Sequence, residues 1–101
     1  MKIGKQSLAF LERLIETPSP SGYEDSAAAL WEAEALTFTP DVRRDAHGNT
    51  DAVVNPGGTP RIMLSGHSDE IGFLVTHIDN DGFLWIAPIG LALPPPARSG
   101  A

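Results

Sequence analysis

One stretch in the second half of the chain limits the possible folds more than any other: Arg61-Ile62-Met63-Leu64-Ser65-Gly66-His67-Ser68-Asp69-Glu70-Ile71-Gly72. Its apolar run at residues 62–64 predicts a short buried strand, and a polar cluster at residues 67–70 follows after two small residues. Open α/β sheets place their chemical groups just beyond the carboxyl ends of strands, where the backbone leaves the core. The pattern therefore predicts an α/β fold with a functional site directly after this strand.

His67 and Asp69 are the candidate site residues in the polar cluster. If the backbone stays extended, both side chains point to the same side, because side chains alternate along a strand. Neutral imidazole binds metal ions, and a carboxylate can accept the other ring N–H and thereby fix the tautomer. A His-x-Asp tripeptide also occurs in surface turns whose two polar residues are unrelated. The residues alone leave both interpretations open.

The first 36 residues predict two helices. Apolar residues recur with helical spacing across residues 7–16, and Pro18 and Pro20 then end that helix. Ser21-Gly22-Tyr23-Glu24 matches a capping box, so a second helix is expected from there to about Leu36. The predicted buried stripe of this second helix consists of Ala27, Leu30, Trp31 and Ala35.

Strand and turn patterns continue to residue 90. Residues 41–54 predict two short strands around a turn at Gly48 and Asn49, since both residue types tolerate positive φ, and His47 is expected in that turn. A second turn signal, Asp79-Asn80-Asp81-Gly82, lies between two segments rich in β-forming residues and predicts a hairpin. The order of two helices followed by strands is compatible with an α/β or an α+β fold. The expected fold class is α/β, with two N-terminal helices on a small mixed sheet and a β-hairpin at the end.

Composition excludes several classes of function. The chain of 101 residues has a net charge of −6 and a pI near 4.8, which argues against nucleic-acid binding because that requires a basic face. It has no cysteine, so any metal must be held by His, Asp or Glu. No apolar run approaches the roughly 18 residues of a membrane span, and Glu12 and Arg13 interrupt the first apolar run too early for a secretory signal. A cytoplasmic protein without a membrane partner is expected.

Four motifs in register resemble one family of metallopeptidases. Gly66-His67-Ser68-Asp69-Glu70-Ile71-Gly72-Phe73 resembles the His-Met-Asp-Glu-Ile-Gly-Phe signature of the metal-dependent aminopeptidases that include glutamyl aminopeptidases, cellulase-M-like proteins and tetrahedral aminopeptidases. The other matching motifs are Ser19-Pro20-Ser21-Gly22-Tyr23-Glu24, Asp45-Ala46-His47-Gly48-Asn49 and the segment 75–90. The resemblance covers residues 8–90 and implies the N-terminal part of a zinc-peptidase catalytic domain of αβα type.

The resemblance also implies a chemistry. Members of this family hydrolyse peptides from the N-terminus with two divalent metal ions, zinc or cobalt, and form homo-oligomers. His67 matches the first metal ligand, and Asp69 matches the carboxylate that supports it. The family's other ligands lie further along its chains, so these residues supply at most one ligand where a catalytic zinc needs about three. The chain alone is therefore expected to be an inactive N-terminal fragment.

The resemblance predicts two segments: residues 1–70 from the catalytic domain, and residues 71–90 as a hairpin at the start of an inserted β domain. Residues 91–101 are expected to form a Pro-rich disordered tail, because three consecutive prolines cannot join a central strand or helix. The sequence from Leu91 onward departs from the family, and truncation, an altered reading frame or a degraded gene would each explain this. A different interpretation is a non-catalytic small domain or degenerate fragment that binds a partner through an exposed sheet edge. A serine hydrolase using Ser68 is disfavoured, because the motif lacks the second glycine of a nucleophile elbow.

Overall fold

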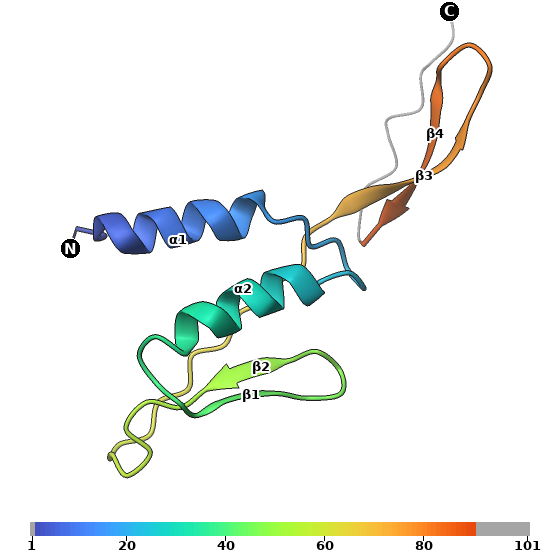
Figure 1. The fold of residues 1–101 in the computed structure, drawn as a ribbon. Coiled ribbons are helices and arrows are strands. Elements are labelled where there is room, and N and C mark those ends of the chain that lie inside the picture. Colours follow the sequence, from blue (N-terminus) through green and yellow to red (C-terminus); the bar gives the residue numbers. More distant parts are fainter. Residues whose placement is uncertain (1, 91–101) are drawn as a thin grey trace, which may run out of the picture.

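The computed structural model describes residues 2–90, which form two helices followed by two separate β-hairpins (Figure 1). The helices are α1 (Lys5–Glu16) and α2 (Asp25–Ala35). Strand β1 (Val42–Arg44) pairs antiparallel with β2 (Thr50–Ala52), and β3 (Gly72–Ile78) pairs antiparallel with β4 (Leu84–Ile89). The predicted α/β class, with two N-terminal helices and a terminal hairpin, is confirmed. The tail predicted for residues 91–101 lies outside the described residues, and the domain boundary after residue 70 stays a prediction.

The sheet differs from the expected one. In place of one mixed sheet, residues 2–90 contain two separate two-stranded antiparallel sheets. Parallel pairing is limited, within this range, to an isolated bridge between Pro20 and Glu70. Figure 1 shows the β1–β2 hairpin beneath α2, while the β3–β4 hairpin extends away from the helices. The two hairpins therefore do not join into one layer.

The prediction of a buried strand at Ile62, Met63 and Leu64 is wrong for this chain. These residues form no strand, and they are 81%, 87% and 93% exposed. A strand needs a neighbour that accepts its backbone hydrogen bonds and a second layer that covers its side chains. Within residues 2–90 this segment has neither, and it runs as an irregular chain towards β3 (Figure 1).

Helix α2 supplies most of the small core. Ala27, Ala28 and Ala35 are buried, and Leu30 and Trp31 are half-buried, so the predicted stripe is confirmed in part. The helix contacts both α1 and β2 (Figure 1). Because three of these five side chains are alanines, the apolar area that folding removes from water is modest.

Much apolar surface stays uncovered in the described part of the chain. Helix α1 has no buried residue, and no large side chain within residues 2–90 is fully buried. The radius of gyration is 19.0 Å, whereas a compact domain of this length has about 13 Å. Neither described helix has the length and apolar character that a membrane crossing requires. The helices and hairpins of residues 2–90 are formed, but no second layer of structure within this range covers their apolar faces.

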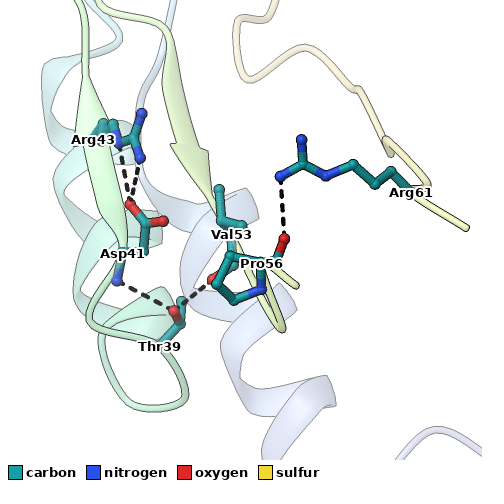
Figure 2. Close-up of polar contacts among 6 residues, drawn as sticks. All are labelled: Thr39, Asp41, Arg43, Val53, Pro56 and Arg61. Carbon is teal, nitrogen blue, oxygen red and sulfur yellow. Dashed lines mark hydrogen bonds and ion pairs between the residues drawn. The ribbon is translucent and has the colours of Figure 1, made fainter. Parts of the chain in front are cut away.

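A buried threonine joins the end of α2 to the end of β2. Thr39 Oγ1 donates a 2.6 Å hydrogen bond to the Val53 carbonyl oxygen and accepts a 3.2 Å bond from the Asp41 amide (Figure 2). Asp41 in turn accepts bonds of 3.1 and 2.9 Å from the Arg43 guanidinium. Figure 2 also shows Arg61 donating to the carbonyl oxygen of Pro56, in the loop that follows β2. The two Thr39 bonds tie the base of the first hairpin to the segment that follows α2.

Both predicted hairpin turns are confirmed. Gly48 and Gly82 have φ of 88° and 85°, in the left-handed region that favours glycine. Asp45 Oδ1 accepts bonds of 2.8 and 3.0 Å from the amides of His47 and Asn49, and His47 is exposed as expected. The Asp79 carboxylate does the same in the second turn, with two amide bonds of 3.0 Å each. Each aspartate therefore satisfies amides that the ladder leaves unpaired.

Candidate functional site

The segment between α1 and α2 is held against the polar cluster by a set of bonds that we call the clasp, formed by Ser19, Ser68 and Glu70. The Glu70 amide donates to the Ser19 carbonyl oxygen at 2.9 Å, and the Ser19 amide donates to Glu70 Oε1 at 3.3 Å. The hydroxyl of buried Ser19 donates to the Ser68 carbonyl oxygen at 2.9 Å. Although the predicted strand 62–64 is absent, the clasp fixes the position of the residues that follow it.

His67 and Asp69 are in direct contact. His67 Nδ1 lies 3.0 Å from Asp69 Oδ1 and 2.8 Å from the Asp69 carbonyl oxygen. Because an ionised carboxylate and a carbonyl can only accept, this geometry assigns the ring proton to Nδ1 and leaves a lone pair on Nε2. The His67 side chain is 85% exposed, so Nε2 is accessible. The pair has the orientation expected of a metal-binding imidazole and its carboxylate partner, and its role stays a prediction.

Ser21 also belongs to this arrangement, although the sequence analysis did not identify it as a site residue. Its Oγ donates a 2.6 Å hydrogen bond to Asp69 Oδ2, the oxygen that does not face His67. This bond is the largest cause that lowers the pKa of the Asp69 carboxyl below its ordinary value of 3.8, and the His67 side chain lowers it further. Ser21, Asp69 and His67 therefore form a continuous hydrogen-bonded row.

The capping-box interpretation of Ser21 is wrong. Helix α2 begins at Asp25, and its N-cap residue is Glu24, which makes no side-chain cap bond. Glu24 Oε1 instead accepts a 2.7 Å bond from the Gly22 amide. Gly22 has a φ of 91°, so the chain turns there and Ser21 lies outside the helix start. The motif 19–24 indicated this site only through its family resemblance.

The polar cluster forms one wall of a shallow pocket. The pocket has a volume of about 200 Å³ and is lined by Leu14, Ile15, Ser19, His67, Ser68, Asp69 and Glu70. A larger hollow of about 440 Å³ lies between the two helices, but the side chains that line it include no imidazole. The smaller pocket combines ligand-capable groups with two apolar side chains of α1, so we take it as the candidate site.

The residues of the pocket can supply one ligand of a metal site but not a complete set. His67 can offer Nε2 to an ion, while Asp69 is engaged by His67 and Ser21. Among residues 2–90, no three His, Asp or Glu side chains lie close enough together to hold a metal ion. His47 lies in the first hairpin turn and His77 in β3. A complete metal centre therefore requires ligands from outside this stretch.

The chain is similar to a family of aminopeptidases and to several of its proteins. The model of the family described as M42 glutamyl aminopeptidase matches residues 48–98. Lysyl aminopeptidase of Pyrococcus furiosus is 39% identical over 85 residues, which are 83% of this chain and 24% of that protein. Putative aminopeptidase FrvX of Escherichia coli is 32% identical over 84 residues, which are 83% of this chain and 23% of that protein.

A solved structure has a similar fold over most of the chain. The TET aminopeptidase of Thaumarchaeota archaeon SCGC AB-539-E09 matches with a TM-score of 0.73 and 29% identity, over 86% of this chain and 24% of that one. The chain thus spans about a quarter of the length of the relatives that it matches. With a family model that covers half of its residues and a matching fold, the chain belongs to the M42 glutamyl aminopeptidase family.

Proposed function

We propose that this chain is the N-terminal part of a metal-dependent aminopeptidase that removes residues from the N-termini of peptides. The observation that carries the proposal is the contact between His67 and Asp69 in a chain of the M42 family. When bound, a pair of divalent ions such as zinc or cobalt supplies an activated water and a polarised peptide carbonyl.

The chain's own residues have distinct tasks in this proposal. His67 offers Nε2 as the first ligand, and Asp69 accepts the Nδ1–H, which leaves the lone pair of the neutral ring on Nε2. Leu14 and Ile15 of α1 border the pocket beside these groups and give it an apolar side. Peptides are the proposed substrates, and the proposed setting is a cytoplasmic homo-oligomer of the complete protein.

The proposed activity needs residues beyond those described. Since about three protein ligands hold a catalytic zinc and His67 is one, the 101-residue chain alone is proposed to be inactive. The catalytic assignment is therefore tested in a chimera in which this chain's matching segment replaces that of the Pyrococcus furiosus lysyl aminopeptidase.

The test compares the chimera with the same chimera carrying His67→Ala. We expect the first to hydrolyse a lysyl chromogenic substrate when zinc or cobalt is added, and the second to bind less metal and to be inactive. Size-exclusion chromatography and circular dichroism establish that both are folded. A folded chimera whose metal content and activity do not depend on His67 would contradict the proposal.

A second candidate function is partner binding without catalysis. It is favoured by the β3–β4 hairpin, a two-stranded sheet whose apolar side chains are exposed, among them Phe73, Phe83 and Trp85. An unpaired strand edge is a template for another chain. If the chimera is folded but inactive with either metal, while the 101-residue chain forms a stoichiometric complex with a full-length relative, this second function is supported.

A further inference from the structure

We propose that Ser21 is a positioning residue for the metal-binding imidazole: its hydroxyl holds the Asp69 carboxylate in the orientation that accepts the Nδ1–H of His67. The inference rests on the proposed function, because the orientation of His67 matters only if Nε2 has a ligand to meet. Ser21 touches neither substrate nor metal in this role and acts through Asp69.

The two oxygens of the Asp69 carboxylate have separate partners. Oδ2 accepts from Ser21 Oγ at 2.6 Å, and Oδ1 faces His67 Nδ1 at 3.0 Å. A carboxylate rotates easily about its last side-chain torsion, which is broad rather than staggered. A short hydrogen bond to an ionised oxygen is about twice as strong as a neutral one. The Ser21 bond therefore restricts the rotation that would turn Oδ1 away from the imidazole.

Ser21 is itself held in place from two sides. The clasp fixes Ser19 and the Pro20–Glu70 bridge next to it. On the other side, Gly90 at the end of the second hairpin lies close by, since a Cβ added there would be 3.6 Å from Ser21 Oγ. The Ser21 side chain is half-buried, and its hydroxyl donates to Asp69 Oδ2 in this position.

A purely structural role for Ser21 makes a different prediction from a positioning role. If Ser21 has a structural role, removing its hydroxyl should open the clasp. A positioning role changes the proton distribution on His67 while the clasp stays closed. The His67 tautomer and the exchange rate of the Glu70 amide, which donates to Ser19, separate the two.

The experiment uses the full 101-residue chain with ¹⁵N-labelled imidazoles at about pH 8, where an ordinary histidine is neutral. The ¹⁵N shifts report which ring nitrogen carries the proton, and a His67→Gln variant assigns the signal. His47 and His77 serve as references in the same spectrum, since neither contacts Asp69. We expect His67 to be enriched in the Nδ1–H tautomer relative to both.

Ser21→Ala is expected to lower the ratio of Nδ1–H to Nε2–H at His67 by about 2- to 10-fold, the effect of one net hydrogen bond. Ser21→Thr keeps a hydroxyl and should restore the ratio. Ser26→Ala, in the exposed first turn of α2, is the matched control and should change nothing.

Three results would overturn the inference. The first is that His67 of the wild type has no more of the Nδ1–H tautomer than His47 and His77. The second is that Ser21→Ala leaves the ratio of Nδ1–H to Nε2–H at His67 unchanged. The third is that this ratio falls only when the Glu70 amide also exchanges faster. This readout needs no metal, so it stays separate from the chimera assay. A chimera without metal-dependent activity would remove the proposed function and leave the tautomer result intact.

Discussion

The backbone amide of Glu70 donates a 2.9 Å hydrogen bond to the carbonyl oxygen of Ser19. Together with the other two bonds of the clasp, it holds the connection between the two helices beside the polar cluster that carries His67. In a complete α/β sheet the preceding strand would place such a cluster, but residues 62–64 are unpaired here. The clasp therefore does locally what a sheet does in a larger domain, and its strength decides how well the site is formed in this chain.

Ser19→Ala should weaken the clasp. The substitution removes the donor to the Ser68 carbonyl oxygen at a residue that is 5% exposed, which costs about 1 kcal/mol for one hydrogen bond. Hydrogen exchange of the Glu70 amide should accelerate roughly fivefold as a result. Ser26→Ala is the control at an exposed serine. An unchanged Glu70 exchange rate would show that the Ser19 hydroxyl does not hold the clasp.

The isolated chain should be marginally stable and should self-associate. Its core consists of the three alanines of α2, while the apolar side chains of the β3–β4 hairpin are exposed on a two-stranded sheet. Such a hairpin is at best marginal in water, and exposed apolar patches favour association. Thermal unfolding followed by circular dichroism should be broad, and light scattering should rise with concentration. A monodisperse monomer with a sharp, cooperative melt would contradict this expectation.

Acid should loosen both hairpin turns. The Asn49 side chain is the main cause that lowers the pKa of Asp45, and the Phe83 amide is the main cause that lowers the pKa of Asp79, both from an ordinary value of 3.8. A carboxyl whose pKa is lower in the folded state contributes stability above its unfolded pKa, and this is lost as pH falls through the folded pKa. The turns should therefore hold above about pH 4, the unfolded pKa, and open as pH falls further through the lowered pKa values of Asp45 and Asp79.

Cross-strand NOEs followed from about pH 6 to about pH 2 test this prediction. Asp79→Asn keeps an oxygen that accepts the two turn amides but cannot titrate, so the second hairpin of that variant should open less with acid than the wild type. If both hairpins of the wild type keep their NOEs at the lowest pH, the turn carboxylates are not what acid disrupts.

The 101-residue chain should show no aminopeptidase activity. Within the described residues His67 stands without two further ligands, and a catalytic zinc needs about three. The measurement is hydrolysis of a panel of aminoacyl chromogenic substrates by the purified chain with added zinc or cobalt. Turnover that depends on metal and disappears in His67→Ala would refute the expectation, whereas turnover that survives His67→Ala points to a contaminating protease.

The local elements could be predicted from the sequence because local signals determine them. Helical spacing, prolines and the two Asp-to-Gly turn signals depend on residues within a few positions of each other, and both helices and both hairpins lie where these signals indicate. The absence of a strand at residues 62–64 could not be predicted in this way. An apolar run becomes a strand only when another strand pairs with it, and the described residues contain none that does.

The site was predictable in part for a related reason. The contact between His67 and Asp69 joins residues two positions apart, so alternation along an extended chain was enough to anticipate it. The bond from Ser21 to Asp69 joins residues 48 positions apart. Residues 21–24 also match the pattern of a helix cap. Nothing in the local sequence distinguishes a Ser21 that caps the helix from a Ser21 that donates to Asp69. The partner of Ser21 was decided by the clasp, which is a tertiary contact.

The last prediction separates the roles of His67, Asp69 and Ser68 in the chimera with the Pyrococcus furiosus relative. His67→Ala removes a ligand, so activity should be lost and metal content should fall. Asp69→Asn keeps the shape but weakens the acceptor for the ring N–H, which should cost about 10–100-fold in metal affinity or activity. Ser68→Ala should have little effect, because the clasp uses the Ser68 carbonyl oxygen rather than its hydroxyl. Metal analysis and steady-state kinetics rank the three, and a His67→Ala chimera with full metal content and normal turnover would show that His67 is not a ligand.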